Sequence, residues 1–269
     1  MPAQTIDAVD RERYPIDDLD GPVGRALVAR CRSELAAVGA CDLPGFLARQ
    51  AVEQIVAEIP RWGATPHRTE TTHNIEFSGG EADLADDDPL RLQVRSAKSL
   101  IAYDQIPGSS PLRAVYESDE LTAFVGAALG VEPLFRQSDE IGALNVMLYD
   151  PGDELGWHFD NADFVVTLML QQPAAGGAFE YVPMLRTADD RNPRGVAALL
   201  AGDRTGVRTM SPEPGTLALF RGHLSPHRVT PIEGDTQRIN AVLAYAHTPD
   251  ARLTASARRI FFGRGEEEA

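Results

Sequence analysis

Apolar residues recur at helical spacing in three stretches of the first half of the chain, and each stretch predicts a helix. The stretches are 23–38, 47–59 and 111–129. Gly39 and Gly130 follow the first and the last of them, as is typical of helix ends. The three helices are expected to form a layer within residues 1–140, together with flanking strands on either side of an acidic loop at 78–89.

The second half of the chain carries short apolar segments separated by Gly, Pro and Asp, which predicts an all-β sandwich or barrel. The predicted strands are 141–149, 164–171, 178–182, 216–220 and 239–247. One long connection, 183–214, contains a predicted helix near 195–200 and has the length of a lid or a dimer element. No low-complexity linker divides the sequence, so residues 1–269 are expected to form a single domain.

The charge and the residue composition of the chain limit the kinds of molecule that it is expected to bind. The formal net charge of the 269 residues is −15, which argues against general binding to nucleic acid or to an anionic membrane. A small-molecule partner and a monomer or homodimer are expected. Cys31 and Cys41 are too few for a disulfide framework, and no apolar stretch reaches the ~20 residues of a membrane span, so a cytoplasmic location is expected. Lys98 is the only lysine, so anion sites are expected to use arginine.

His158 and Asp160 stand two residues apart in Gly-Trp-His-Phe-Asp-Asn. On an extended segment alternate side chains share a face, so the imidazole and the carboxylate can point at one metal ion. His227 lies 69 residues further on, directly after a predicted strand, and can supply a second imidazole. Two histidines and one carboxylate leave coordination positions open, which suits non-haem Fe(II), although zinc also accepts these ligands. His223 is the competing histidine.

Arg238 begins the apolar segment that leads into the last predicted strand. A guanidinium that points into a strand-built core is costly unless it meets an anion. The far carboxylate of a dicarboxylate would satisfy it in bidentate fashion.

These motifs together resemble the iron(II) and 2-oxoglutarate-dependent oxygenases. The resemblance covers residues 141–247 and rests on the motifs at 158–160, 215–222, 227–231 and 238–240. It implies a mainly β fold with N-terminal helices, the double-stranded β-helix of jelly-roll or cupin-like type. It also implies that His158, Asp160 and His227 bind Fe(II), and that Arg238 binds 2-oxoglutarate. The family's reaction consumes 2-oxoglutarate and O₂ and releases succinate and CO₂.

The family often places an amide or phenol that contacts 2-oxoglutarate on the strand before this motif, which makes Asn145 and Tyr149 candidates. The segments 156–161, 176–181 and 260–264 resemble the branch that halogenates or hydroxylates free amino acids. Halogenases of that branch have a small residue in the carboxylate position, so Asp160 favours hydroxylation; desaturation or ring formation stay open.

The substrate expected from this branch is a polar or basic amino acid. Arg95 is the candidate clamp for its carboxylate, Glu140 and Asn161 are candidates for its amine, and Trp157 is a candidate wall of the pocket. The alternatives are an N-acylated, carrier-bound or nucleoside substrate for the same chemistry, a zinc hydrolase or isomerase with the same ligands, and a non-catalytic binding barrel.

Overall fold

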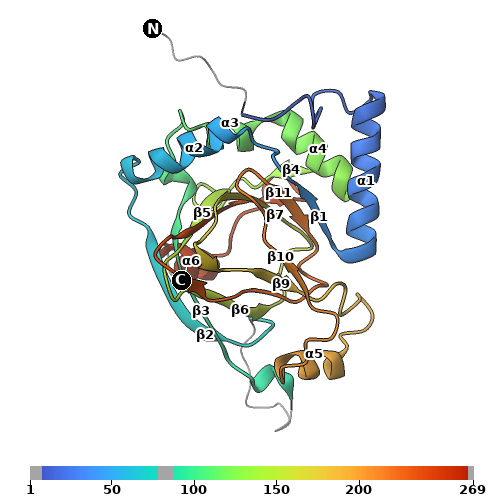
Figure 1. The fold of residues 1–269 in the computed structure, drawn as a ribbon, viewed down its shortest axis with the longest axis vertical. Helices are drawn as coiled ribbons and strands as arrows, with labels where there is room; N and C mark the ends of the chain where they lie inside the picture. The colour runs from blue at the N-terminus through green and yellow to red at the C-terminus, as the bar shows by residue number, and fades with distance from the viewer. Residues whose placement is uncertain (1–7, 78–87, 266–269) are drawn as a thin grey trace.

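The computed structural model describes residues 8–77 and 88–265, so nearly all of the predicted acidic loop at 78–89 lies outside the described residues. Helices lie along one side of a strongly curled sheet, and a further helix lies beyond its opposite side (Figure 1). Within the described part of the chain, no helix is long and apolar enough to cross a membrane. The predicted fold class, mainly β with N-terminal helices, is confirmed.

The first two predicted helices form close to their expected bounds, as α1 (Pro22–Val38) and α2 (Arg49–Glu58). A short 3-10 turn, η1 (Ile59–Arg61), follows α2. Helix α1 ends at Gly39, which adopts a left-handed φ of 70° and donates its N–H to the carbonyl of Leu35. That conformation favours glycine, because other residues pay a steric cost there.

The third predicted helix is divided into α3 (Pro111–Glu117) and α4 (Asp119–Leu129). Ser118 adopts an extended conformation between them, and its hydroxyl accepts a hydrogen bond from the N–H of Leu121. A serine that caps a new helix competes with continuation of the old one. The apolar spacing predicts one helix at 111–129, but the structure has two consecutive helices there.

The main sheet has eleven strands, and ten of them follow the order β1-β11-β7-β14-β5-β3-β6-β12-β9-β10, with β2 paired to β3. Its strands are β1 (Ala40–Leu43), β2 (His67–His73), β3 (Val94–Ile101), β5 (Leu144–Tyr149), β6 (Glu154–His158), β7 (Val165–Gln171), β9 (Phe179–Tyr181), β10 (Arg208–Met210), β11 (Leu217–Phe220), β12 (His227–Val229) and β14 (Arg238–Leu243). Two small sheets pair β4 (Phe135–Arg136) with β15 (Tyr245–Ala246), and β8 (Ala175–Gly176) with β13 (Ile232–Glu233).

Strand β3 joins the two halves of the curled sheet. Its second half pairs with β5, where Leu100 lies opposite Met147, and its first half pairs with β6, where Ser96 lies opposite Leu155. Side chains alternate between the two faces along each strand. On β5, Val146 and Leu148 therefore pack into the large core under the helices, while the alternate residues face the inside of the curl.

The connection at 183–214 contains helix α5 (Pro193–Leu200) and strand β10. Val196 and Leu199 of α5 pack with Ile75 and Phe159, and β10 pairs with β9 in the main sheet. Part of the segment considered as a lid thus packs against the barrel, through α5 and β10. Helix α6 (Ala255–Phe262) and the short 3-10 turns η3 (Pro89–Arg91) and η4 (Tyr103–Gln105) were not predicted.

Asp42 of β1 provides a test of this packing. One of its carboxylate oxygens is buried without a hydrogen-bond partner, and burial, with a contribution from Glu34, raises the pKa of Asp42 to about 6. Because the folded pKa lies above the unfolded one, the ionised carboxylate destabilises the fold above that pH, and the penalty disappears as the pH falls toward ~4.

We therefore expect Asp42→Asn to raise the free energy of unfolding by up to about 3 kcal/mol near pH ~8, and by much less near pH ~4. Urea unfolding at both pH values measures the difference. The exposed Asp189 supplies the control substitution Asp189→Asn, which should have little effect at either pH. An equal gain at both pH values would contradict the assignment to the Asp42 charge.

Candidate active site

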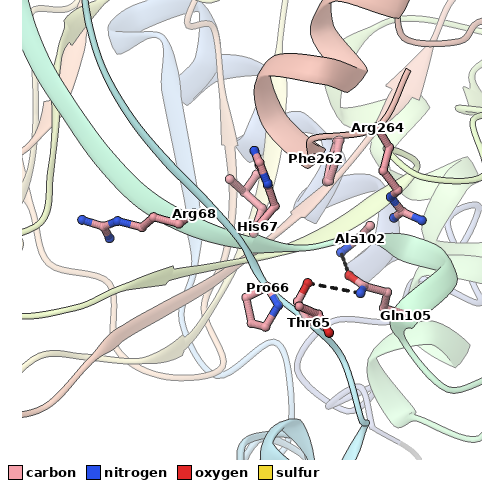
Figure 2. A pocket seen from close by; sticks show the side chains of 9 residues that line it. Thr65, Pro66, His67, Arg68, Ala102, Gln105, Phe262 and Arg264 are labelled. Atoms are coloured by element: carbon pink, nitrogen blue, oxygen red, sulfur yellow. Dashed lines mark hydrogen bonds between the residues drawn. The ribbon is translucent and has the colours of Figure 1, made fainter. Parts of the chain in front are cut away.

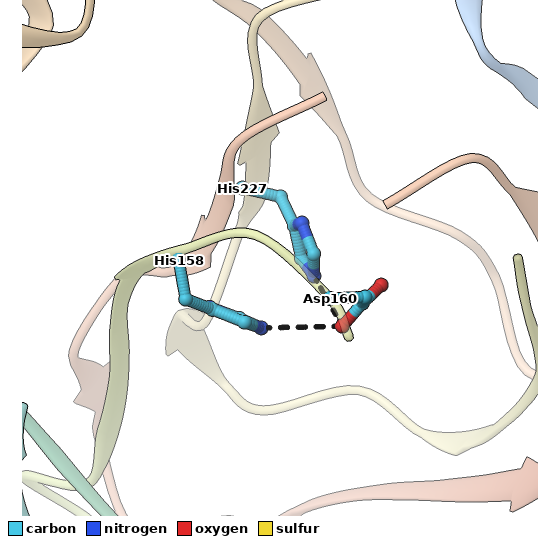
Figure 3. A group of neighbouring side chains, drawn as sticks. All are labelled: His158, Asp160 and His227. Atoms are coloured by element: carbon cyan, nitrogen blue, oxygen red, sulfur yellow. Dashed lines mark ion pairs between the residues drawn. The ribbon is translucent and has the colours of Figure 1, made fainter. Parts of the chain in front are cut away.

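Three side chains that the sequence singled out as metal ligands meet inside the barrel (Figure 3). His158 ends β6, Asp160 follows in the next loop, and His227 begins β12 directly opposite His158 in the sheet. The Nε2 atoms of His158 and His227 lie 3.7 and 3.5 Å from Oδ1 of Asp160. One ligand atom from each residue lies within 4.8 Å of the others, which makes this the metal-ligand cluster found among residues 8–77 and 88–265.

Backbone carbonyls fix the orientation of both imidazoles. Nδ1 of His158 donates to the carbonyl of Gly156 at 2.9 Å, and Nδ1 of His227 donates to the carbonyl of Ser225 at 3.0 Å. In each ring the proton therefore resides on Nδ1, and Nε2 presents its lone pair to the centre of the cluster. This is the arrangement that a metal-binding histidine needs.

The charge states also fit a divalent metal. Burial and the neighbouring His227 hold the pKa of His158 well below its usual value. Burial alone would raise the pKa of Asp160, but the adjacent imidazoles outweigh it and lower the pKa. The cluster thus offers a neutral His158 imidazole and an ionised Asp160 carboxylate. Oδ2 of Asp160 is buried without a hydrogen-bond partner. A buried orphaned carboxylate oxygen is costly unless a cation binds it.

Gly222 is required by the close approach of the Asp160 loop. The N–H of Asp160 donates to the carbonyl of Gly222 at 3.1 Å. A Cβ atom at residue 222 would lie 1.7 Å from Oδ2 of Asp160 and 3.0 Å from Cε1 of His227. His223, the competing histidine, points its Nδ1 to the backbone carbonyl of Asp160 at 3.1 Å and supports the loop.

Arg238 is buried at the start of β14, opposite Tyr149 of β5. Its Nε has no hydrogen-bond partner, and burial lowers the pKa of the guanidinium. The guanidinium carbon lies 5.4 Å from the centre of the Tyr149 ring. On the same face of β5, Oδ1 of the buried Asn145 also lacks a partner. The unsatisfied guanidinium of Arg238 fits a dicarboxylate co-substrate, which would supply an acceptor for it.

Aromatic rings surround the two histidines. The ring of His227 lies 5.3 Å from that of Phe179 and 4.9 Å from that of Phe220. The ring of His158 lies 5.2 Å from Phe77, which itself stacks on His73 at 4.1 Å. Such walls exclude water from the metal and restrict rotation of the ligands.

His73 and Ser96 were not singled out from the sequence. Ser96 accepts the N–H of Gly156 at 3.0 Å and donates to Nε2 of His73 at 2.6 Å, while Nδ1 of His73 donates to the carbonyl of Asn74 at 2.8 Å. This chain fixes the wall beside His158, whose ring meets that of His73 edge-on at 6.3 Å. The alternation of β3 is the only sequence signal for Ser96, and it does not tell which face is the inner one.

Arg186 ties the loops around the metal cluster together. It is buried and donates to Glu76 and to the carbonyl of His223, in both cases at 2.6 Å. Its guanidinium carbon also lies 3.7 Å from the centre of the Phe159 ring. The connection at 183–214 is thereby bound to the segments before and after the metal ligands.

Arg95 and Glu140, two predicted substrate residues, lie on the outer surface and not in the site. The guanidinium of Arg95 binds the carboxylates of Glu70 at 2.9 Å and Glu154 at 3.2 Å, on the face of β3 that points away from the cluster. Glu140 has a side chain that is 73% exposed and lies 3.6 Å from Arg252. Both charges are therefore solvated or paired at the surface.

Trp157, a candidate wall of the pocket or core residue, packs in the core. It lies between His158 and Gly156 on β6 and points to the opposite face, where it packs under α5 with Val196. The guanidinium carbon of Arg228 lies 5.1 Å from its ring centre, so its role is in packing. Asn161 is exposed in the loop after Asp160 and stays a prediction.

A second hollow lies away from this cluster, under α6 (Figure 2). It has a volume of about 300 Å³ and is lined by His67, Arg68, Leu100 and Arg264, among others. Its two arginines are already paired, Arg68 with Asp153 and Arg264 with Asp104. This hollow therefore offers no unpaired arginine for an anion.

Comparison with known proteins agrees with this site. A family model described as Halogenase D matches residues 90–260. Among solved structures, the chain is similar to an oxidoreductase of the 2OG-Fe(II) oxygenase family from Burkholderia pseudomallei, with 17% identity over 83% of this chain and 92% of that chain and a TM-score of 0.53. A search of curated proteins found no match.

Two further structures share the fold. The α-ketoglutarate-dependent epimerase SnoN from nogalamycin biosynthesis is 16% identical over 82% of this chain and 83% of its own, with a TM-score of 0.55. HygX from Streptomyces hygroscopicus, solved with nickel, 2-oxoglutarate and hygromycin B, is 15% identical over 80% of this chain and 85% of its own, with a TM-score of 0.51.

The jelly roll, the inward His/Asp/His cluster and the buried Arg238 define a non-haem iron(II) and 2-oxoglutarate-dependent oxygenase. Since the matched residues cover more than half of its length, the chain belongs to the halogenase D family. The resemblance stated from the sequence is thus confirmed for the oxygenase family.

Substitution of Gly222 tests the metal site. The added methyl group of Gly222→Ala must displace the Asp160 carboxylate, so we expect Fe(II) or Zn(II) to bind about 10–100-fold more weakly. Competition with a chromophoric chelator measures the affinity. Gly108, where a Cβ atom would meet nothing within 4 Å, supplies the matched control Gly108→Ala. Unchanged metal affinity in Gly222→Ala would show that the ligands do not gather as described.

Proposed function

We propose that this oxygenase hydroxylates an unactivated C–H bond of a free amino acid, polar or basic, or of a close derivative. The observation that carries the proposal is the carboxylate of Asp160, which completes the ligand cluster with His158 and His227. In the halogenases that the sequence resembles, a small residue stands in this position and leaves room for chloride. Here the carboxylate occupies that position, which favours delivery of oxygen over delivery of a halide.

Each inward residue has a defined task in this reaction. His158, Asp160 and His227 would hold iron on one face and leave the remaining coordination positions for small ligands. Arg238 would bind the distal carboxylate of 2-oxoglutarate, and Tyr149 and Asn145 are the neighbours proposed to orient it. Iron and 2-oxoglutarate held by these residues would supply the oxidising chemistry, in which O₂ and 2-oxoglutarate yield succinate, CO₂ and one oxygen atom for the substrate.

The support for an amino-acid substrate is the resemblance of residues 156–161 to the branch that acts on free amino acids. Asn161 is the proposed contact to an amine of the substrate, since it adjoins Asp160 in the loop. Arg95, the candidate for the substrate carboxylate, and Glu140, the other candidate for the amine, are paired at the surface and are not proposed as substrate contacts. An N-acylated, carrier-bound or nucleoside substrate would use the same chemistry.

Succinate formation tests the proposal directly. The iron-loaded protein is supplied with 2-oxoglutarate, O₂ and each amino acid in turn, and succinate is quantified by mass spectrometry. We expect at least one polar or basic amino acid to stimulate succinate formation and to gain the mass of one oxygen atom. Asp160→Ala should abolish this, because it removes a metal ligand. Stimulation by none of the amino acids would remove the amino-acid proposal and keep the oxygenase class.

Arg238 separates the oxygenase from a zinc hydrolase with the same ligands. Removing one partner of a buried charge pair costs about 2–5 kcal/mol, so Arg238→Met should raise the apparent KM for 2-oxoglutarate about 30-fold or more. Steady-state succinate formation at varied 2-oxoglutarate measures it. The exposed Arg259 of α6 supplies the control Arg259→Met. A hydrolase would keep its activity in Arg238→Met and would ignore 2-oxoglutarate.

A further inference from the structure

Lys98, the only lysine of the chain, is buried on the inner face of β3. It is 5% exposed and alternates with Ser96, whose hydroxyl lies in the wall beside His158. The charge of the Lys98 ammonium helps to lower the pKa values of His158 and His73, and the Asp160 carboxylate opposes the lowering of the pKa of Lys98. Alternation along β3 therefore places the Lys98 side chain on the same inward face as Ser96.

No hydrogen bond or ion pair joins the Lys98 ammonium to another described residue. Nζ of Lys98 lies 6.0 Å from the centre of the Phe261 ring in α6. Burial lowers the pKa of Lys98 to about 8, so the amine still carries its charge near neutral pH. A buried cation without a partner is unfavourable and calls for an anion.

The two carboxylates that influence Lys98 are already engaged. Asp153 receives both N–H groups of Arg68, at 2.5 and 2.7 Å. Asp160 belongs to the candidate metal cluster, and a bound divalent metal would take up its charge. Neither is free to neutralise the ammonium.

The co-substrate does not supply the missing anion either. A divalent metal and Arg238 carry three positive charges, while Asp160 and doubly charged 2-oxoglutarate carry three negative charges. The loaded site is therefore neutral without Lys98, and one positive charge is left over. An anionic group of the primary substrate would balance it.

We propose that Lys98 binds the carboxylate of the primary substrate and fixes its orientation toward the metal. The inference rests on the proposed function for the oxygenase chemistry, and it adds the group that the protein recognises. It assigns to an inward lysine the role for which sequence reasoning expected an arginine. Phe261, from a different element, lies beside the same ammonium and is placed to cover the bound carboxylate.

Because the chain has a single lysine, selective ¹⁵N labelling of lysine gives one Nζ resonance. The zinc-loaded protein with 2-oxoglutarate is titrated with acetate, and with acetamide as its neutral isostere. We expect a saturable shift of the Nζ resonance with acetate and none with acetamide. A shift produced by 2-oxoglutarate alone would assign Lys98 to the co-substrate and overturn the proposal, as would the absence of any acetate response.

Variants give an independent measurement. Charged hydrogen bonds contribute about 1.5–3 kcal/mol, so Lys98→Met should raise the KM for the carboxylate-bearing substrate about 10–100-fold, and the KM for 2-oxoglutarate less than ~3-fold. Arg95→Met is the matched control, since it removes a cation from the outer face of the same strand and should leave both constants unchanged. An unchanged substrate KM in Lys98→Met would overturn the proposal.

Thermal unfolding tests whether Lys98 has a purely structural role. Replacing an uncompensated buried charge by a similar apolar side chain should leave the melting temperature of Lys98→Met equal or higher. A lower melting temperature with an unchanged substrate KM would assign Lys98 to the fold. If no amino acid stimulates the unmodified enzyme, the proposed function fails, and the acetate titration still decides the role of Lys98.

Discussion

The pairing of β6 with β12 is the constraint on which the site depends. His158 lies directly opposite His227 in this pair, and the register shifts immediately afterwards, before Val229 meets Leu155. A slip of one residue in either strand would turn an imidazole to the outside, because alternate side chains point to opposite faces. The pairing is fixed from both sides, since β12 also pairs with β9 and places Tyr181 opposite His227. The apolar contacts of Leu155 and Val229 inside the barrel oppose such a slip.

Local patterns in the sequence predict much of this architecture. The apolar spacing of α1 and α2 and the short strands β5, β7, β11 and β14 lie close to their expected bounds. The three ligands of the cluster are also predicted, from the spacing of His158 and Asp160 and from the position of His227 after a predicted strand. Asp160 itself lies in the loop after β6. Helix α6 is missed because it spans only eight residues, which is too short for the spacing of its apolar residues to predict a helix.

The substrate side of the site shows where sequence reasoning ends. Arg95 and Lys98 stand three residues apart on β3, so alternation places them on opposite faces. Nothing in the chain itself tells which face is the inner one, because that depends on strands far away in the sequence, such as β6. The arginine has the chemistry expected of an anion clamp and lies outside, while the lysine lies inside. The same alternation places Trp157 on the outer face, because its neighbour His158 points inward.

Arg186 joins the 183–214 connection to two segments that are far from it in the sequence. Glu76 precedes the barrel strands that carry the ligands, Arg186 lies between them, and His223 adjoins the last ligand. One guanidinium therefore sets how far three separate segments stand apart. A substitution of Arg186 would therefore disturb the segment before the ligands, the loop between His158 and Asp160, and the loop that precedes His227 at the same time.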